Sequence, residues 1–230
     1  MTSTTKRKTV GLALSGGGAR GFAHVGVVKA LTDNGIPIDC VAGTSAGSFV
    51  GAAVAAGLSA DEIYKFGEGL NWFKISRPPY SMRALLSNAG MKTFIEKHFE
   101  LGRFEDLKIP FAAVACDLET CSEVVLKDEG DLITAIRASC AIPGVFTPVE
   151  DDQGRMLVDG GVVAPMPIDA LKQFGPDIIV AVDLMASGNS FISNPRTLVG
   201  MDIGLHSAER VLRFEAAQAE LCVCRVVIPA

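Results

Sequence analysis

Short apolar runs alternate along the chain with longer segments of helical pattern. Runs rich in Val, Ile, Leu and Ala predict strands at residues 10–14, 38–42, 110–118, 122–128, 156–159, 177–184 and 222–229. The segments between them predict helices at residues 22–34, 46–56, 91–100, 132–139 and 196–220, and a further helix that begins after Ser59, with Glu62 at capping-box spacing. This alternation favours an α/β protein with a largely parallel sheet.

Length and regularity predict a single folding unit. The chain has 230 residues and shows neither an internal repeat nor a low-complexity segment. We expect one domain over residues 9–230, preceded by a flexible N-terminal segment, residues 1–8. Only residues 69–90 interrupt the alternation, and they contain Pro78 and Pro79.

Composition narrows the class of protein. With 49% hydrophobic residues and a net charge of -5, the chain is expected to be soluble and globular, and it shows no basic footprint for nucleic acid. The first apolar run breaks at Ser15 and the longest, 49–58, is also short, so we expect neither a secretory signal nor a membrane span and predict a cytoplasmic protein. The six cysteines lack CxxC spacing, so reduced thiols and no metal are expected. The sequence does not indicate an oligomeric state.

A glycine-rich loop, SGGGARG at residues 15–21, links the first predicted strand to the first predicted helix. Backbone N–H groups in such a turn, at the positive end of a helix dipole, bind anions. The loop alone fits two ligands. Gly16, Gly18 and Gly21 match the G-x-G-x-x-G pattern for a dinucleotide pyrophosphate, but the loop also suits the oxyanion of an acyl-transfer reaction.

A second motif, GTSAG at residues 43–47, favours acyl transfer. The motif lies between a predicted strand and a small-residue helix, which is the context of a nucleophile elbow carrying Ser45 on a sharp, exposed turn. Gly43 and Gly47 leave room for the close crossing of strand and helix. A ribose-binding acid should end the second strand, whereas the only candidate, Asp39, lies near its start. The glycine loop is therefore interpreted as an oxyanion hole.

A serine nucleophile needs a base. Asp159 ends the short strand MLVD and precedes Gly160 and Gly161, so its carboxylate could approach Ser45 and accept its proton directly. The alternative is a triad in which Asp159 or Asp183 acts through His206, in the α/β-hydrolase order of serine, acid and histidine. His24 and His98, the other histidines, are expected to be structural.

Together, SGGGARG (15–21), GTSAG (43–47), ASCAIPGVFTPV (138–149) and DGG (159–161) resemble the bacterial patatin-like phospholipases. The resemblance implies a three-layer α/β/α fold and hydrolysis of lipid acyl esters without metal or cofactor. It implies Ser45 as nucleophile, Asp159 as base and Gly16, Gly17 and Gly18 as oxyanion donors. Further motif positions are Arg20, Gly21, Gly43, Gly47, Gly160 and Gly161, with Arg20 supporting its loop.

Two further hypotheses remain open. The chain could be a regulatory or adaptor protein on the same scaffold, although the intact Ser45 and Asp159 favour an enzyme. Residues 69–90 place Trp72, Phe73 and Tyr80 among Lys74, Arg77 and Arg83. Aromatic rings beside cations suit a membrane interface, so this segment is a candidate for peripheral membrane contact.

Overall fold

The computed structural model describes residues 7–69, 86–99, 102–185 and 223–227. Within these residues, eight strands form one sheet in the order β5-β6-β3-β2-β1-β7-β8, with β4 paired to β3 in addition. The strands are β1 (Val10–Leu14), β2 (Cys40–Thr44), β3 (Phe111–Asp117), β4 (Glu123–Lys127), β5 (Val149–Glu150), β6 (Met156–Asp159), β7 (Ile178–Asp183) and β8 (Val223–Val227).

The centre of the sheet is parallel, as the sequence predicts. Strand β1 pairs in parallel with both β2 and β7, and β2 pairs in parallel with β3. Strands β4, β5, β6 and β8 are added antiparallel around this centre. The carboxyl ends of four parallel strands therefore meet at one edge of the sheet, where α/β proteins place their sites.

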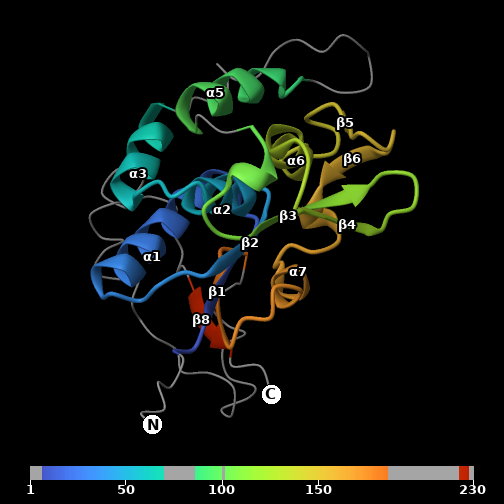
Figure 1. The fold of residues 1–230 in the computed structure, drawn as a ribbon. Helices are drawn as coiled ribbons and strands as arrows, with labels where there is room; N and C mark the ends of the chain where they lie inside the picture. Colours follow the sequence, from blue (N-terminus) through green and yellow to red (C-terminus); the bar gives the residue numbers. More distant parts are fainter. Residues whose placement is uncertain (1–6, 70–85, 100–101, 186–222, 228–230) are drawn as a thin grey trace.

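Helices cover both faces of the sheet (Figure 1). The helices are α1 (Phe22–Asp33), α2 (Ala46–Ala55), α3 (Ala60–Gly69), α5 (Ala89–Phe99), α6 (Leu132–Ser139) and α7 (Ile168–Lys172), with 3₁₀ turns η1 (Gly18–Gly21), η2 (Phe104–Asp106) and η3 (Gly160–Val162). Helix α2 lies on the sheet at its centre and α7 covers the opposite face, which gives the expected three layers.

The two faces of the sheet carry side chains of different size. Leu12 and Leu14 belong to the large core beneath α1 and α2, whereas Ala13 between them belongs to the smaller core beneath α7. The same alternation places Val180 in the first core and Ala181 in the second. Because successive side chains of a strand point to opposite faces, one run of apolar residues supplies both cores.

Most predicted elements are confirmed. Helix α6 spans the predicted residues, and Ser59 and Glu62 form the predicted capping box, with Ser59 N donating to Glu62 Oε2 (2.8 Å) and Glu62 N to Ser59 Oγ (3.3 Å). Strand β2 begins two residues later than predicted, at Cys40. The helix predicted over 196–220 lies outside the described residues.

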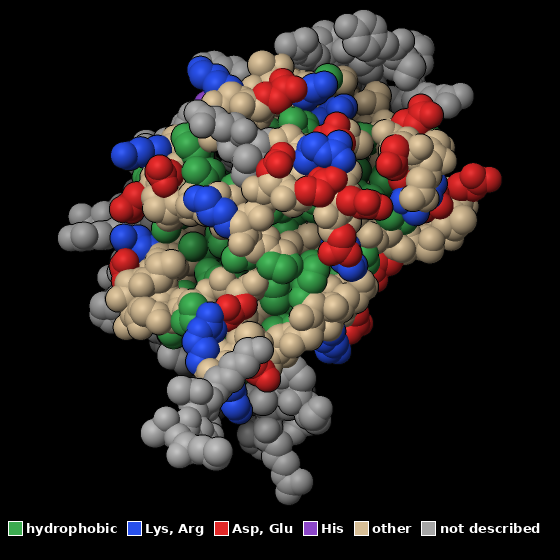
Figure 2. Space-filling model, viewed as in Figure 1, with side chains coloured by type: hydrophobic (Ala, Val, Ile, Leu, Met, Phe, Trp, Pro, Cys, Tyr) green, Lys and Arg blue, Asp and Glu red, His purple; other side chains and the backbone are tan. Residues whose placement is uncertain are grey.

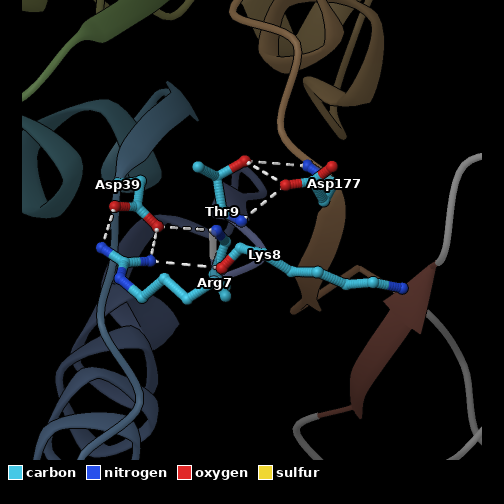
Figure 3. Close-up of polar contacts among 6 residues, drawn as sticks. Arg7, Lys8, Thr9, Asp39 and Asp177 are labelled. Carbon is cyan, nitrogen blue, oxygen red and sulfur yellow. Dashed lines mark hydrogen bonds and ion pairs between the residues drawn. The ribbon is translucent and has the colours of Figure 1, made fainter. Parts of the chain in front are cut away.

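The amino-terminal end of β1 is fixed by two carboxylates (Figure 3). Arg7, in the segment expected to be flexible, donates two hydrogen bonds to Asp39, of 2.8 and 2.6 Å, and Val10 N donates to the same carboxylate. Thr9 N donates to Asp177 at 2.7 Å. Asp39 is thus engaged at the end of the sheet opposite the glycine loop, which agrees with rejecting it as a ribose ligand.

On the face that Figure 2 shows, acidic and basic side chains are interspersed, and hydrophobic side chains gather in the middle. Among the residues that the structure describes, no helix is both long and apolar enough to cross a bilayer.

Candidate active site

Ser45 occupies a sharp turn between β2 and α2. Its backbone has φ 54° and ψ -124°, a conformation that costs a non-glycine residue about 1–3 kcal/mol and is found at functional sites. The flanking glycines make the turn feasible. A Cβ at Gly43 would lie 2.3 Å from Gly47 O, and one at Gly47 would lie 2.2 Å from Leu14 O. The G-x-S-x-G pattern is therefore a packing requirement, as the sequence predicts.

The Ser45 hydroxyl donates a hydrogen bond to the Asp159 carboxylate, with 2.6 Å between Oγ and Oδ2. The other oxygen, Oδ1, accepts from Gly161 N at 2.7 Å. Both side chains are buried, with exposures of 8% for Ser45 and 6% for Asp159. The expectation of an exposed serine is wrong. The turn itself is sharp, but the polypeptide from Asp159 onward packs against it.

Burial has a consequence for the acid. Because desolvation penalises the charged form, it raises the pKa of Asp159 above its ordinary value, while hydrogen bonds from Ser45 and Gly161 act in the opposite direction. Asp159 N donates to Ala141 O at 2.9 Å, and a Cβ at Gly160 would lie 2.3 Å from Val114 O. The backbone of Asp159 and that of Gly160 are therefore both fixed by neighbouring segments, and this fixes the position of the Asp159 carboxylate.

Ser139, at the C-terminal end of α6, stabilises the turn at Ser45 through its side-chain hydroxyl. Its hydroxyl accepts a hydrogen bond from Ser45 N (2.8 Å) and donates one to Val114 O (2.6 Å). It thereby joins α6, β3 and the strained residue through one buried oxygen. Sequence reasoning missed this role, although Ser139 lies inside the ASCAIPGVFTPV motif and ends a helix just before a proline. Those two features were the available signal.

The glycine loop lies beside Ser45, but its three glycines are not equivalent. Gly16 N donates to Pro165 O at 2.9 Å, so this N–H is already engaged, contrary to the expected donor role. The N–H groups of Gly17 and Gly18 find no acceptor among the described residues. A Cβ at Gly21 would lie 2.7 Å from Ala46 Cβ, which shows how tightly the loop packs on α2.

Three polar side chains hold this loop. Ser15 Oγ accepts from Leu184 N at 2.8 Å, and Arg20 Nη1 donates to Leu184 O at 3.2 Å. Arg20 thus ties the loop to the chain after β7, in line with the supporting role that the resemblance implies. The fully buried His24 contacts Ser15 O through Nε2 at 2.8 Å.

None of the described histidines contacts Ser45. Burial lowers the pKa of His24 to about 4, so its imidazole is neutral at pH 7 and Nε2 carries the proton given to Ser15 O. His98 stacks on Phe94 and meets Phe66 edge-on, so its ring packs among aromatic side chains. His206 lies outside the described residues. The Ser45 hydroxyl contacts Asp159 directly, with no imidazole between them.

An apolar pocket begins at the glycine loop and runs between α1, α2, α3 and α5. Gly18 of the glycine loop and Ala46, the residue after Ser45, are among its lining residues. Its large side chains are Phe22, Val25, Phe49, Val50, Ile63 and Met91, and Cys140 also lines it. A pocket with such a lining is suited to an apolar group rather than a charged one.

The part of the chain that the structure describes contains no cluster of three His, Cys, Asp or Glu side chains that could hold a metal ion. The described cysteines, Cys40, Cys116, Cys121 and Cys140, are free. Burial raises the pKa of the Cys140 thiol, and the nearby Asp159 acts in the same direction, so Cys140 is a neutral neighbour of the site.

Comparison with known proteins identifies the family of the chain. The family described as patatin-like phospholipase matches residues 12–172, and the chain belongs to this family. It is 40% identical over 181 residues to an NTE family protein of Mycobacterium tuberculosis, covering 77% of this chain and 49% of that protein. It is 32% identical over 194 residues to human patatin-like phospholipase domain-containing protein 6, covering 80% of this chain and 14% of that protein.

The chain thus spans half or less of the length of these relatives. Among solved structures, VipD from Legionella pneumophila superposes with a TM-score of 0.56 at 16% identity, covering 69% of this chain and 46% of that one. At that identity the likeness concerns the fold alone.

Proposed function

We propose that the chain is a serine acyl hydrolase that cleaves fatty-acyl esters of lipids through a dyad of Ser45 and Asp159. The observation that carries the proposal is the 2.6 Å hydrogen bond from the Ser45 hydroxyl to the Asp159 carboxylate. It is the nucleophile–base contact that acyl transfer requires. Family membership supports a lipid ester as the substrate class.

In this mechanism Ser45 Oγ attacks the ester carbonyl carbon as its proton passes to Asp159 Oδ2. The carbonyl oxygen becomes an oxyanion, and the N–H groups of Gly17 and Gly18 stabilise it. The alcohol leaves with the proton from Asp159, and an acyl-enzyme remains. Water then attacks the acyl carbon, gives its proton to Asp159, and the fatty acid leaves as Ser45 recovers the proton.

Two features of the site support these roles. Gly16 N is bonded to Pro165 O and so anchors the loop, while the next two N–H groups have no acceptor in the described ranges and would serve an oxyanion. Each such donor contributes about 10²–10³ in rate. The apolar pocket beginning at Gly18 and Ala46 would take the acyl chain of the substrate.

Several finer statements about this protein are still predictions from the sequence. They are turnover without metal or cofactor, a cytoplasmic location and membrane contact through residues 69–90, most of which lie outside the described residues. The alternative of a regulatory or adaptor protein predicts weak or no ester hydrolysis. The N–H groups of Gly17 and Gly18, which have no acceptor within the part of the chain that the structure describes, and the Ser45–Asp159 contact favour the enzyme, because binding alone requires neither.

The test is to trap the acyl-enzyme. The purified chain, with EDTA present, is incubated with a nitrophenyl ester and with a fluorophosphonate, and the modified peptide is identified by mass spectrometry. We expect turnover of the ester and a single adduct on Ser45 that is lost in Ser45→Ala. Adduct formation at another residue, or a folded wild-type protein that turns over no ester, would contradict the proposal.

A further inference from the structure

The large hydrophobic side chains that are exposed belong to segments that adjoin the carboxyl ends of the parallel strands or the Ser45–Asp159 pair. Among the described residues there are six of them: Leu118, Ile142, Met156, Val162, Val163 and Met185. Val162 and Met185 are the most open, each with 60% exposure. We call these six residues the apolar rim. Scattered exposed hydrophobics are ordinary on protein surfaces, but a gathering at one place marks an interaction surface.

Backbone connections place the rim around the Ser45–Asp159 pair. Val162 belongs to η3, which follows Asp159 directly, and Ile142 follows Ala141, whose carbonyl accepts from Asp159 N. Leu118 N donates to Met156 O, which ties the ends of β3 and β6 together three residues before Asp159.

The other side of the rim adjoins the glycine loop. Met185 follows Leu184, and Leu184 bonds to both Ser15 Oγ and Arg20. All six rim residues therefore lie near the carboxyl ends of the central parallel strands, at the edge of the sheet where Ser45 follows β2.

The charged residues in and beside the apolar rim indicate which kind of lipid bilayer it can bind. The two rim segments nearest Asp159, residues 141–149 and 160–168, contain no charged residue. The charges beside the rim are of both signs. Asp117, Glu119 and Asp183 are acidic, whereas the exposed Arg20 donates to Leu184 O, next to Met185. Arg155, next to Met156, is paired with Asp151 at 2.7 Å. An anionic bilayer attracts basic segments and is repelled by carboxylates, whereas a zwitterionic bilayer meets an uncharged apolar rim without that penalty.

We propose that the apolar rim docks the protein on a zwitterionic phospholipid surface, with the site facing the lipid. The proposal rests on the proposed lipid hydrolase function, since a substrate held in a bilayer must reach Ser45 from this edge. It is distinct from the membrane contact predicted for residues 69–90. Side chains of the rim enter the interface between headgroups and acyl chains, so that an ester can pass to Ser45 without crossing water.

The experiment measures vesicle binding and hydrolysis separately. Flotation with phosphatidylcholine vesicles is carried out in the Ser45→Ala background, which keeps the vesicles intact. The double variant Val162→Gln/Met185→Gln is compared with Val162→Ile/Met185→Leu, which keeps both positions apolar. We expect the glutamine pair to lose about tenfold in vesicle binding and the apolar pair to bind like its parent.

In the active enzyme, the glutamine pair should hydrolyse a soluble short-chain ester as well as the wild type, but vesicle lipid about tenfold more slowly. Loss of vesicle binding would support docking even if the wild type turns over no ester, and only the proposed function would then fail. Unchanged binding by the glutamine pair would overturn docking. So would tighter binding of the parent protein to phosphatidylserine vesicles than to phosphatidylcholine vesicles, or a wild-type dimer that the glutamine pair dissociates.

Discussion

Asp159 occupies the position along β3 that Ser45 would have taken had β2 continued straight. Thr44 pairs with Val114, and the next residue of β3, Ala115, pairs with Asp159. Strand β4 holds the other edge of β3 over residues 112–116, so β6 must continue on the edge that β2 leaves. The chain turns away at Ser45, and the carboxylate arrives beside it. Two residues 114 positions apart are brought together by a change of strand at one edge.

The first prediction concerns Asp159→Asn. The amide keeps the shape of the side chain but cannot accept a proton from Ser45, so ester turnover should fall at least about 10³-fold, as for Ser45→Ala. Because burial raises the pKa of Asp159, the folded state favours its neutral form, and the amide should unfold at the same or a higher temperature at pH 7. Turnover and melting temperature are measured on the same samples, with His206→Ala as the control expected to be fully active.

The second prediction concerns Ser139→Ala. Removing its hydroxyl leaves Ser45 N buried without an acceptor, at a cost of about 1–3 kcal/mol, and releases the strained turn. We expect kcat to fall about tenfold or more while KM changes little, since the pocket is untouched. The matched control is Ser48→Ala: its hydroxyl donates to Ser45 O, but that carbonyl keeps a bond from Ser48 N at 2.8 Å. Equal losses in the two variants would argue against a positioning role for Ser139.

The third prediction concerns the pH dependence of hydrolysis. Asp159 accepts a proton only when ionised, so activity is present above its pKa and is lost as pH falls through it. Since the pKa of Asp159 is raised, the midpoint of kcat/KM should lie above the ordinary aspartate value of 3.8. A profile measured from pH 4 to 8 should be the same for the wild type and His206→Ala. A midpoint near 6.5 that disappears in His206→Ala would favour the triad instead.

The fourth prediction concerns stability and His24. Its pKa is about 4 in the folded protein against 6.5 ordinarily, so the unfolded chain takes up this proton first as pH falls. The free energy of unfolding should therefore decline between pH 6.5 and 4, by up to about 3 kcal/mol from this group. His24→Gln keeps an N–H donor for Ser15 O but does not titrate. Its urea midpoints should fall less steeply with pH; parallel curves for both proteins would contradict the assignment.

The fifth prediction concerns residues 69–90. Trp72 is the only tryptophan, so its fluorescence reports on this segment alone. If the cations of the segment meet lipid headgroups, anionic vesicles should shift the emission of Trp72 to the blue. Replacing Trp72 and Phe73 with alanine should slow hydrolysis of vesicle lipid more than that of a soluble ester. An unshifted spectrum, or equal losses on both substrates, would leave these rings as ordinary packing residues.

The sequence by itself determined the elements and the local chemistry. Apolar periodicity located β1, α2 and α6 because burial on one or both faces dictates where hydrophobic residues recur. The G-x-S-x-G motif predicted the turn at Ser45 because only glycine tolerates the contacts found at Gly43 and Gly47. The motif order also singled out Asp159 as the partner of Ser45, through resemblance.

Tertiary structure alone decided which groups are available at the site. Gly16, Gly17 and Gly18 look alike in sequence, but a carbonyl from Pro165, far along the chain, engages only the first N–H. Ser139 acts through contacts to β3 and to Ser45 that no local pattern encodes. The burial of Ser45, the neutral His24 and the apolar rim likewise depend on neighbours distant in sequence. Periodicity records which face of an element is buried, whereas a hydrogen-bond partner is set by how elements pack, and that is a property of the whole fold.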